Sequence, residues 1–245
     1  MQRILVFANP IAGRGKGQQI ASLVQAELTR HGYQADLYLG RMDQAQTQAP
    51  PPDVRAAVVI GGDGTLRTVA EWAIDSENPS LAIPYPLLIV PMGTANLMGQ
   101  HLGIRWDEKH LGQQVCDAIE HGQVAYLDVA RTREGIFLLM AGVGFDAEVV
   151  HELTRVRSGP INKAKYILPI LRTLLSYSFP ALTVTVDGQR VFGPARGLAW
   201  VGNVPEYGIG FPLLPDAKPN DQLLDVCVMP CASRRDLIRL LLAAA

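Results

Sequence analysis

The sequence has few cysteines and no excess of either charge. Cys116, Cys227 and Cys231 are an odd number without CxxC spacing, which indicates a reducing compartment, ordinary half-buried thiols and no tetrahedral zinc site. The 245 residues contain 22 Lys plus Arg against 23 Asp plus Glu, for a formal net charge of −1. Nucleic-acid binding relies on a broad positive field, so nucleic acid is not an expected partner.

The sequence also lacks a recognisable leader and a long uncharged apolar run. It opens directly into a strand pattern at residues 3–8, without a charged leader and apolar core, so we expect a cytoplasmic protein. The most apolar later stretch, residues 161–179, is interrupted by two lysines, a proline and an arginine. Because a spanning helix needs about 20 predominantly apolar residues, any membrane contact is expected to be peripheral, at the inner membrane surface.

Short apolar runs alternate with helical periodicity in the first half, which is typical of βα units around a parallel sheet. Strands are predicted at 3–8, 35–39, 55–60 and 86–90. Helices are predicted at about 20–28, after Gly64 and at 107–121, with Gly32 and Gly122 placed to end the first and the last. We therefore predict an N-terminal Rossmann-like α/β domain over residues 1–122.

The second half has a different pattern, in which strand-like runs outnumber helical ones. Strands are predicted at 124–131, 135–141, 181–187, 190–192, 196–201 and 223–229, and helices at 146–157, at 163–177 and from about Ser233. Asp187 and Gly188 form a strong hairpin signal. Residues 123–245 are therefore predicted to form a β-rich, β-sandwich-like domain with inserted helices.

A glycine-rich turn, Gly61-Gly62-Asp63-Gly64-Thr65, follows the apolar run at 56–60. Glycines let the main chain approach a phosphate, and the N–H groups at a helix start favour its negative charge. A carboxylate beside phosphates must hold a cation or accept a proton, so Asp63 indicates phosphoryl transfer. The alternative is a tight strand-to-helix turn in which Asp63 caps a helix, and the turn alone leaves both interpretations open.

Two further loops follow neighbouring predicted strands. The loop at 9–17 contains Asn9, Pro10 and Gly13 with the cations Arg14 and Lys16, but it has neither P-loop nor GxGxxG spacing. The loop at 91–96 again follows a strand with a glycine, a hydroxyl and an amide. Open α/β sheets bind ligands at the carboxyl ends of their strands, so the three loops together predict a triphosphate site.

These motifs, in this order, resemble the diacylglycerol kinase catalytic-domain family, which includes bacterial lipid kinases and sphingosine kinases and is distantly similar to NAD kinases. The resemblance extends from Asn9 to about Leu241. Its matching positions are Asn9, Pro10 and Gly13, then 61–66, 93–96 with 102–104, 142–147, 215–217, Asp221 and 223–226.

The resemblance implies transfer of the γ-phosphoryl group of ATP, with Mg²⁺, to a hydroxyl of a membrane lipid such as diacylglycerol, phosphatidylglycerol or a sphingoid base. Asp63 is the best placed catalytic carboxylate within this sequence. Asp221, with the main-chain carbonyls of Lys218 and Leu223, resembles the family's magnesium site, and a turn closed by an Asp side chain is the alternative. The implied nucleotide contacts are Asn9, Pro10, Gly13, Lys16, Gly61, Gly62, Asp63, Gly64, Thr65, Leu66, Arg67, Gly93, Thr94 and Asn96.

The sequence departs from the family pattern at several positions. Arg67 and Thr68 stand where bacterial members often have Asn and Glu, so the contact made there is expected to differ. Gln222 replaces the usual glycine after Asp221, which is expected to strain or reshape that loop. Family members also continue to an Asp-Gly-Glu turn whose glutamate is taken as the general base, so we interpret the sequence as C-terminally truncated and expect it to be weakly active or inactive alone.

Two other functions remain open from the sequence: a NAD kinase-like phosphotransferase for a soluble substrate, and a nucleotide-binding regulatory module without catalysis. The basic and apolar residues at 155–172 favour a solvated basic face over a lipid-binding surface. The oligomeric state is not encoded in a readable way, and a homo-oligomer is compatible with the sequence.

Overall fold

The computed structural model describes residues 2–40, 51, 53–74, 82–155, 167–208 and 211–243. It divides into two compact units, Met1–Leu138 and Leu139–Ala245. This division lies further along the chain than the boundary predicted near residue 122. The difference has a physical basis, because Ile136 is buried against Ala70 and Ile74 and so belongs to the first core.

The first unit contains a four-stranded parallel sheet in the order β2-β1-β3-β4. Its strands are β1 (Arg3–Ala8), β2 (Gln34–Leu39), β3 (Val54–Gly61) and β4 (Leu87–Pro91), which confirms the four predicted strands. The chain runs outward from β1 to β2 on one side and from β3 to β4 on the other. The carboxyl ends of β1 and β3 therefore flank a topological switch point, where open α/β sheets bind ligands.

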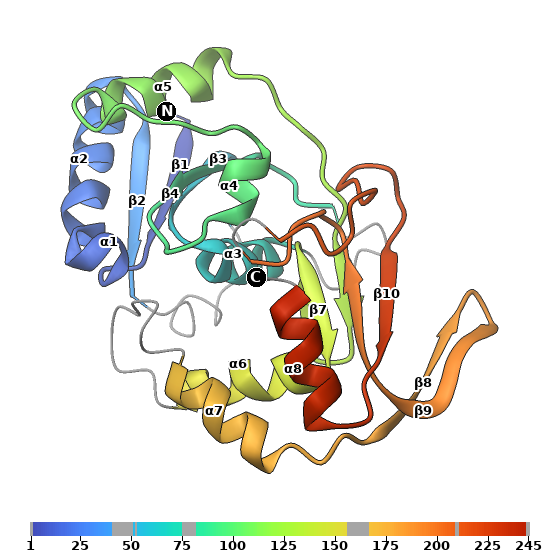
Figure 1. Ribbon diagram of the computed structural model, residues 1–245. Helices are drawn as coiled ribbons and strands as arrows, with labels where there is room; N and C mark the ends of the chain where they lie inside the picture. The colour runs from blue at the N-terminus through green and yellow to red at the C-terminus, as the bar shows by residue number, and fades with distance from the viewer. Residues whose placement is uncertain are drawn as a thin grey trace. The chain divides into compact units, whose positions relative to one another are not determined.

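Helices cover both faces of this sheet (Figure 1). On one face, Val6 and Val58 share a core with Val24 of α2 (Gly17–Arg30) and Val115 of α5 (Leu111–His121). On the other face, the ring of Phe7 makes an edge contact with Trp72 of α3 (Asp63–Ala73), with centroids 5.1 Å apart. Successive residues of β1 thus face opposite sides, as strand geometry requires.

Glycines end two of these helices near the predicted positions. Gly32 has a φ of 85°, and the N–H of Tyr33 donates to the carbonyl of Leu28 at 3.0 Å, which is the pattern of a left-handed helix end. α5 ends at His121, immediately before Gly122. Its start is four residues later than predicted, because Asp107 instead closes a turn by accepting the Lys109 N–H at 3.0 Å.

The strand predicted at 124–131 is wrong over most of its length. Residues 122–129 have no regular secondary structure, and only β5 (Ala130–Thr132) pairs, with β6 (Gly135–Phe137). Tyr126 is 86% exposed, so the apolar alternation there has no layer to pack against. The run predicted at 135–141 is also divided, since β6 belongs to the first unit and β7 (Met140–Val143) to the second.

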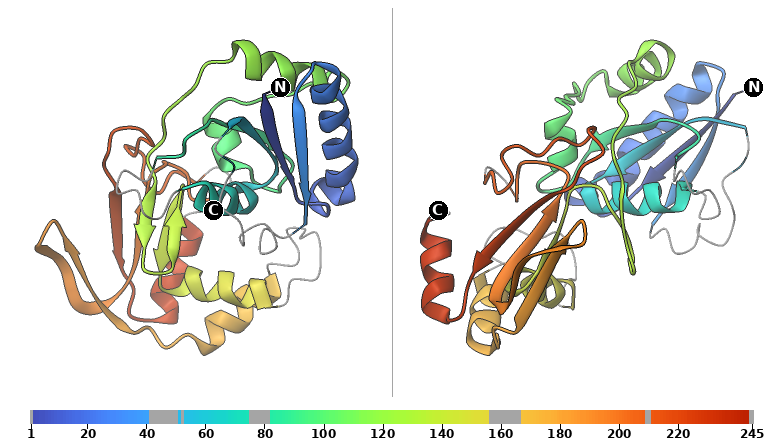
Figure 2. Two further views of the ribbon diagram at one scale, coloured as in Figure 1. Left: turned by 180° about the vertical axis from the view of Figure 1, so that it is seen from behind. Right: turned by 90° about the vertical axis from the view of Figure 1, so that its right-hand side faces the viewer.

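The second unit is built on an antiparallel sheet in the order β10-β9-β7, with β8 also paired to β9. Its other strands are β8 (Ala181–Val186), β9 (Gln189–Gly202) and β10 (Asp225–Pro230). One strand, β9, therefore spans both of the short strands predicted at 190–192 and 196–201. Asp187 and Gly188 both have positive φ, 49° and 79°, which confirms the predicted hairpin turn. The β8–β9 hairpin extends beyond the rest of this sheet (Figure 2).

Three helices pack with this sheet: α6 (Phe145–Arg155), α7 (Ile167–Ser176) and α8 (Arg234–Ala243). Phe145, Tyr177, Trp200 and Leu237 share one buried cluster, and the predicted β-rich domain with inserted helices is confirmed. The parts of the predicted helices at 156–166 lie outside the described residues. No helix in the described ranges is long and apolar enough to cross a bilayer.

The three cysteines are free thiols. Cys116 and Cys231 are buried, and Cys227 is partly buried. Burial raises the pKa of each thiol, that of Cys116 to about 11, so all three stay protonated at neutral pH and are poor nucleophiles.

Candidate functional site

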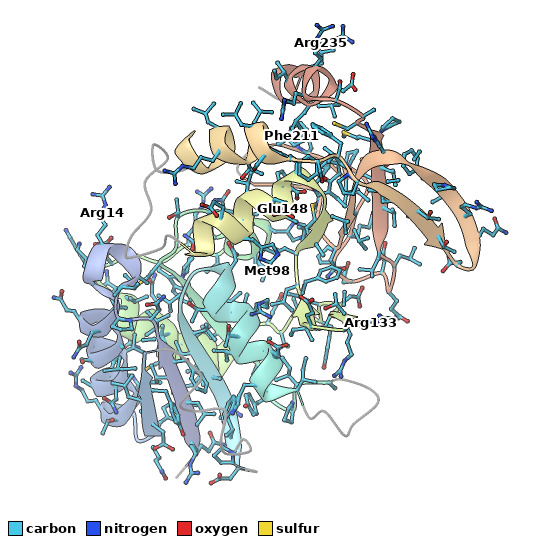
Figure 3. The ribbon with its side chains drawn as sticks, turned by 90° about the horizontal axis from the view of Figure 1, so that it is seen from below. Arg14, Met98, Arg133, Glu148, Phe211 and Arg235 are labelled. Carbon is cyan, nitrogen blue, oxygen red and sulfur yellow. The ribbon has the colours of Figure 1, made fainter. Side chains whose placement is uncertain are left out.

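The loop after β1 has an unusual main-chain conformation. Gly13, Arg14 and Gly15 have φ values of 58°, 59° and 90°, in the left-handed region that favours glycine. They interrupt the short helix α1 (Ala12–Gly15). Arg14 extends away from the fold (Figure 3), and Lys16 is exposed. The loop thus presents two cations at the carboxyl end of β1.

Main-chain hydrogen bonds connect the loops that follow β1, β3 and β4. The N–H of Gly13 donates to the carbonyl of Met92 at 2.9 Å, and the N–H of Met92 donates to the carbonyl of Gly61 at 2.7 Å. The N–H of Asn9 donates to the carbonyl of Ile60 at 3.1 Å. The structure therefore brings the three loops that the sequence singled out to one edge of the sheet.

Two glycines allow the loops after β3 and β4 to touch through their main chains. A Cβ atom on Gly62 would lie 3.0 Å from the Cα of Gly93. A Cβ atom on Gly93 would lie 2.7 Å from the Cα of Gly62 and 2.6 Å from Oδ1 of Asn96. Gly64 differs, because a Cβ atom there would meet nothing within 4 Å. The close approach thus requires glycine at 62 and 93.

Asp63 joins the same two loops through its carboxylate. Oδ2 accepts the N–H of Leu97 at 3.0 Å, and Oδ1 accepts the N–H of Met98 at 3.1 Å. These are the first two residues of the short helix α4 (Leu97–His101), whose N–H groups have no partner within the helix. Asp63 therefore caps α4, although it is itself the first residue of α3.

The loop before α4 is closed by Asn96, which has a φ of 52°. Its Oδ1 accepts the N–H of Gly93 at 2.6 Å, and its Nδ2 donates to the carbonyl of Gly93 at 2.9 Å. The polar atoms of the Asn96 side chain thus bond within their own loop. Thr94 is exposed and leaves its hydroxyl as the side-chain group of this loop that a ligand can reach.

The remaining residues predicted to contact the nucleotide differ in which of their groups a ligand could reach. Leu66 is buried, so only its main chain is available. Thr65 packs over Gly61, where a Cβ atom would lie 2.5 Å from the threonine Oγ1. Pro10 is partly buried, and Arg67 is paired along α3, its Nη1 lying 3.0 Å from Oε2 of Glu71.

Glu71 is a residue of this region that the sequence reasoning missed. Besides pairing with Arg67, its Oε1 accepts the N–H of Ile136 at 3.2 Å. A Cβ atom on Gly135 would lie 2.2 Å from the same oxygen. Glu71 thereby holds the β5–β6 hairpin against α3. The four-residue spacing from Arg67 indicates the ion pair in the sequence, whereas nothing in the sequence indicates the contact with Ile136.

In the second unit, the Gly-Val-Gly-Phe-Asp-Ala motif places Asp146 in a largely buried position. Its Oδ2 accepts Nε1–H of Trp200 at 2.9 Å and the hydroxyl of Tyr207 at 3.4 Å. Its Oδ1 is buried without a hydrogen-bond partner, and a Cβ atom on Gly142 would lie 2.1 Å from Oδ2. Burial raises the pKa of Asp146, although the hydrogen bonds from Trp200, Tyr207 and the main chain oppose the shift.

This environment predicts a specific pH dependence. Because the pKa of Asp146 is raised in the folded state, the folded protein binds this proton more tightly than the unfolded chain. The wild type should therefore gain stability relative to Asp146→Asn as the pH falls from neutral toward the ordinary aspartate value of about 3.9. Urea unfolding of both proteins across this range measures the difference.

Asp107→Asn is the matched control for this experiment. The hydrogen bonds to Asp107 lower its pKa, so its stabilising effect is lost only below the ordinary aspartate value of about 3.9. This variant should track the wild type between pH 7 and about 5. A difference between wild type and Asp146→Asn that is constant with pH would contradict the expected shift.

The proposed magnesium ligands lie in an exposed turn of the second unit. Oδ1 of Asp221 accepts the N–H of Leu223 at 3.1 Å, which is the turn that the sequence left as the alternative. Lys218 is exposed. A carboxylate with neighbouring main-chain carbonyls is a hard oxygen set that suits Mg²⁺ with several waters, so the residues fit this ion in kind. Among the described residues, no three His, Cys, Asp or Glu side chains gather into a metal site.

Gln222 has the strained conformation expected where the family usually has glycine. Its φ is 64°, which is costly for a residue with a Cβ atom. Gln222→Gly should therefore raise the free energy of unfolding by about 0.5–1 kcal/mol, measured in urea. Gln222→Ala keeps the Cβ atom and should give no gain. A loss of stability in the glycine variant would show that contacts of the Gln222 side chain outweigh the strain.

Comparisons with known proteins agree with this architecture. Residues 3–132, just over half of the chain, match the model of the diacylglycerol kinase catalytic domain. Residues 140–244 match the model of the YegS C-terminal NAD kinase beta sandwich-like domain. The crystal structure of a diacylglycerol kinase from Bacillus anthracis str. Sterne has the same fold, with a TM-score of 0.63 and 24% identity, covering 98% of this chain and 77% of that one.

Two relatives of known sequence have similarly low sequence identity to this chain. A diacylglycerol kinase of Mycobacterium tuberculosis (strain H37Rv) is 26% identical over 249 residues, covering 97% of this chain and 76% of the relative. A Pseudomonas putida protein named "Probable lipid kinase YegS-like" is 29% identical over 174 residues, covering 71% of this chain and 55% of the relative. With the catalytic-domain model matched over half of its length, this chain belongs to the diacylglycerol kinase catalytic-domain family.

Proposed function

We propose that this protein is an ATP-dependent lipid kinase that transfers the γ-phosphoryl group of ATP to a hydroxyl of a membrane lipid. The observation that carries the proposal is the junction of three loops at the switch point of the parallel sheet, where Gly13, Met92 and Gly61 are joined by main-chain hydrogen bonds. The family membership and the names of the relatives support the same reaction.

The three loops supply groups suited to a triphosphate. Gly62 and Gly64 flank the start of α3, where free N–H groups and the helix dipole favour a phosphate. Arg14 and Lys16 are exposed cations of the adjoining loop that would offset phosphate charge. Thr94 adds an exposed hydroxyl from the third loop. Charge stabilisation and positioning account for most catalysis of phosphoryl transfer.

We propose Asp63 as the catalytic carboxylate and also as the residue that holds two of the loops together. Both of its oxygens accept main-chain N–H groups from α4, so it also positions the third loop against the second. Each oxygen of a carboxylate can accept more than one hydrogen bond, which leaves capacity for a proton or a cation beside the phosphates. Asp63 would thereby position the loops at 61–67 and 93–96 and also take part in phosphoryl transfer.

We propose two sites for Mg²⁺. Bound with ATP, it would neutralise part of the phosphate charge. In the second unit, the carboxylate of Asp221 and the carbonyls of Lys218 and Leu223 would hold a magnesium ion that fixes the exposed turn. The contribution of the chain itself is to orient the phosphates through the loops at 9–17, 61–67 and 93–96.

A phosphotransfer assay on the full-length protein tests the function. Labelled ATP with Mg²⁺ is offered with diacylglycerol, phosphatidylglycerol or sphingosine in mixed detergent micelles, and separately with NAD. Labelled lipid supports the proposal and identifies the acceptor. Label in NAD alone would instead support a NAD kinase-like enzyme, and ATP binding without turnover would support a regulatory module.

A further inference from the structure

A surface formed by α7 and α8 combines exposed aliphatic side chains with arginines. We define the α7–α8 face by Leu171, Arg172 and Leu175 of α7 together with Arg234, Arg235, Ile238 and Arg239 of α8. We infer that this face docks the protein onto an anionic lipid bilayer. The inference rests on the proposed function, since it places a surface for the membrane that holds the acceptor.

The two helices are physically joined at this face. Nε of Arg234 donates to the carbonyl of Leu174 at 3.0 Å, and Nη2 donates to the carbonyl of Leu175. These carbonyls are in the last turn of α7, where main-chain acceptors lack partners within the helix and favour a cation. The start of α8 is therefore anchored to the end of α7.

The inner sides of both helices are committed to the core. Leu174 packs against the buried cluster of the second unit, Thr173 is buried, and Leu237 of α8 is 2% exposed. The outer sides are different, because Leu171 is 50%, Leu175 is 69% and Ile238 is 44% exposed. Leu171 and Leu175 are four residues apart and so share one side of α7. Leu175 is the most exposed of the large aliphatic residues described by the structure.

The positive charge of α8 indicates which kind of partner the α7–α8 face would bind. Arg235 and Arg239 are exposed, and Arg235 projects outward from α8 (Figure 3). The one acidic residue of the helix, Asp236, accepts the Ser233 hydroxyl at 2.8 Å and the Ala232 N–H at 3.2 Å through Oδ2, and these hydrogen bonds lower its pKa. Its negative charge offsets one arginine, so α8 keeps a net positive charge from Arg234, Arg235 and Arg239. Positive charge beside aliphatic side chains matches an anionic headgroup layer over an apolar interior.

Arg172 contributes less to this charge than the arginines of α8. It lines a cavity of about 420 Å³ together with Glu148, His151 and Glu152 of α6, so acidic side chains lie near it. Of the other cations in the stretch noted in the sequence, Arg157, Lys163 and Lys165 lie outside the described residues, and only the backbone of Arg155 is described. The electrostatic part of docking is therefore assigned to Arg235 and Arg239.

Sedimentation with vesicles tests the inference on the full-length protein. Vesicles of phosphatidylcholine alone are compared with vesicles containing phosphatidylcholine and phosphatidylglycerol at about 2:1. Binding is expected to the anionic vesicles and to weaken with added salt. Changing Arg235 and Arg239 together to Gln should weaken binding by about tenfold to thirtyfold, and Leu175→Ser should weaken it further. Arg234 is left unchanged because it joins the helices.

Two controls distinguish the effect of this surface on vesicle binding from a general effect of lost positive charge and from loss of the kinase reaction. Arg190 and Arg196 are exposed arginines of the same unit on β9, and changing both to Gln should leave vesicle binding unchanged. The inference would be overturned if both double variants lost vesicle binding equally, or if the wild type showed no preference for anionic vesicles. It would also be overturned by a dimer, seen in ultracentrifugation, that Leu175→Ser dissociates. Phosphorylation of uncharged diacylglycerol in micelles of a nonionic detergent should persist in the variant with Arg235 and Arg239 changed to Gln. The absence of any lipid phosphorylation in the wild type would refute the proposed function alone.

Discussion

Replacing Asp63 with alanine should lower the rate of phosphotransfer by about 100-fold or more and also destabilise the first unit. The carboxylate accepts the N–H groups of both Leu97 and Met98, and its loss leaves two donors at the start of α4 without their acceptor. Such a loss costs about 1–3 kcal/mol. The loop carrying Gly93 would then shift from the glycine turn, and displacements of about 1 Å can reduce catalysis about 100-fold.

Urea unfolding and the micelle assay measure the two effects separately. Asp53→Ala is the control for stability, because Asp53 is an exposed carboxylate of the same unit whose nearest cation, Arg3, lies 3.5 Å away; it should change stability by less than about 1 kcal/mol. Asp63→Asn retains one acceptor but turns an amide donor toward the second N–H, so we expect it to resemble the alanine variant. Full activity in Asp63→Ala would remove Asp63 and its loop contact from the mechanism.

Gly93→Ala should weaken ATP binding at least about tenfold, because the added methyl group forces two loops apart. It would lie 2.7 Å from the Cα of Gly62 and 2.6 Å from Oδ1 of Asn96. The first contact is with main chain, which cannot rotate away, so the loop must move. Overpacking of this kind costs about 1–3 kcal/mol of stability. Calorimetric titration with Mg·ATP and urea unfolding of the same samples report the two losses.

Gly64→Ala is the matched stability control in the same turn. Gly64 lies within α3, and a Cβ atom there meets nothing within 4 Å. Alanine should leave the fold as stable or raise the free energy of unfolding by up to about 1 kcal/mol. If Gly93→Ala were as stable as Gly64→Ala and bound ATP normally, the main-chain contact between the loops would have no role in the site.

Features encoded locally were predictable from the sequence. The strands of the parallel sheet follow from apolar runs, the end of α2 from Gly32, and the β8–β9 turn from Asp187-Gly188. The positions of the three glycine loops then follow from the general rule that parallel strands share one carboxyl edge. The strain at Gln222 was also readable, because the family pattern places a glycine there.

Features that depend on distant partners were not predictable. Residues 124–129 have an apolar pattern but pair with no strand, and an isolated pattern does not reveal whether a partner exists. The sequence offered Asp63 as the cap of the helix that directly follows the glycine turn. In the structure Asp63 is the first residue of that helix, and it caps one that starts 34 residues later, at Leu97. The contacts of Asp146 with Trp200 and Tyr207 likewise depend on how the antiparallel sheet places β9 beside α6.

Hydrogen exchange with and without ATP and Mg²⁺ tests the central claim most directly, because it reports which main-chain N–H groups a nucleotide protects. ATP is expected to slow exchange in all three loops, residues 9–17, 61–67 and 93–96, with little change along the β8–β9 hairpin. Bound ATP that leaves these three loops unprotected, or protects only segments elsewhere, would contradict the claim.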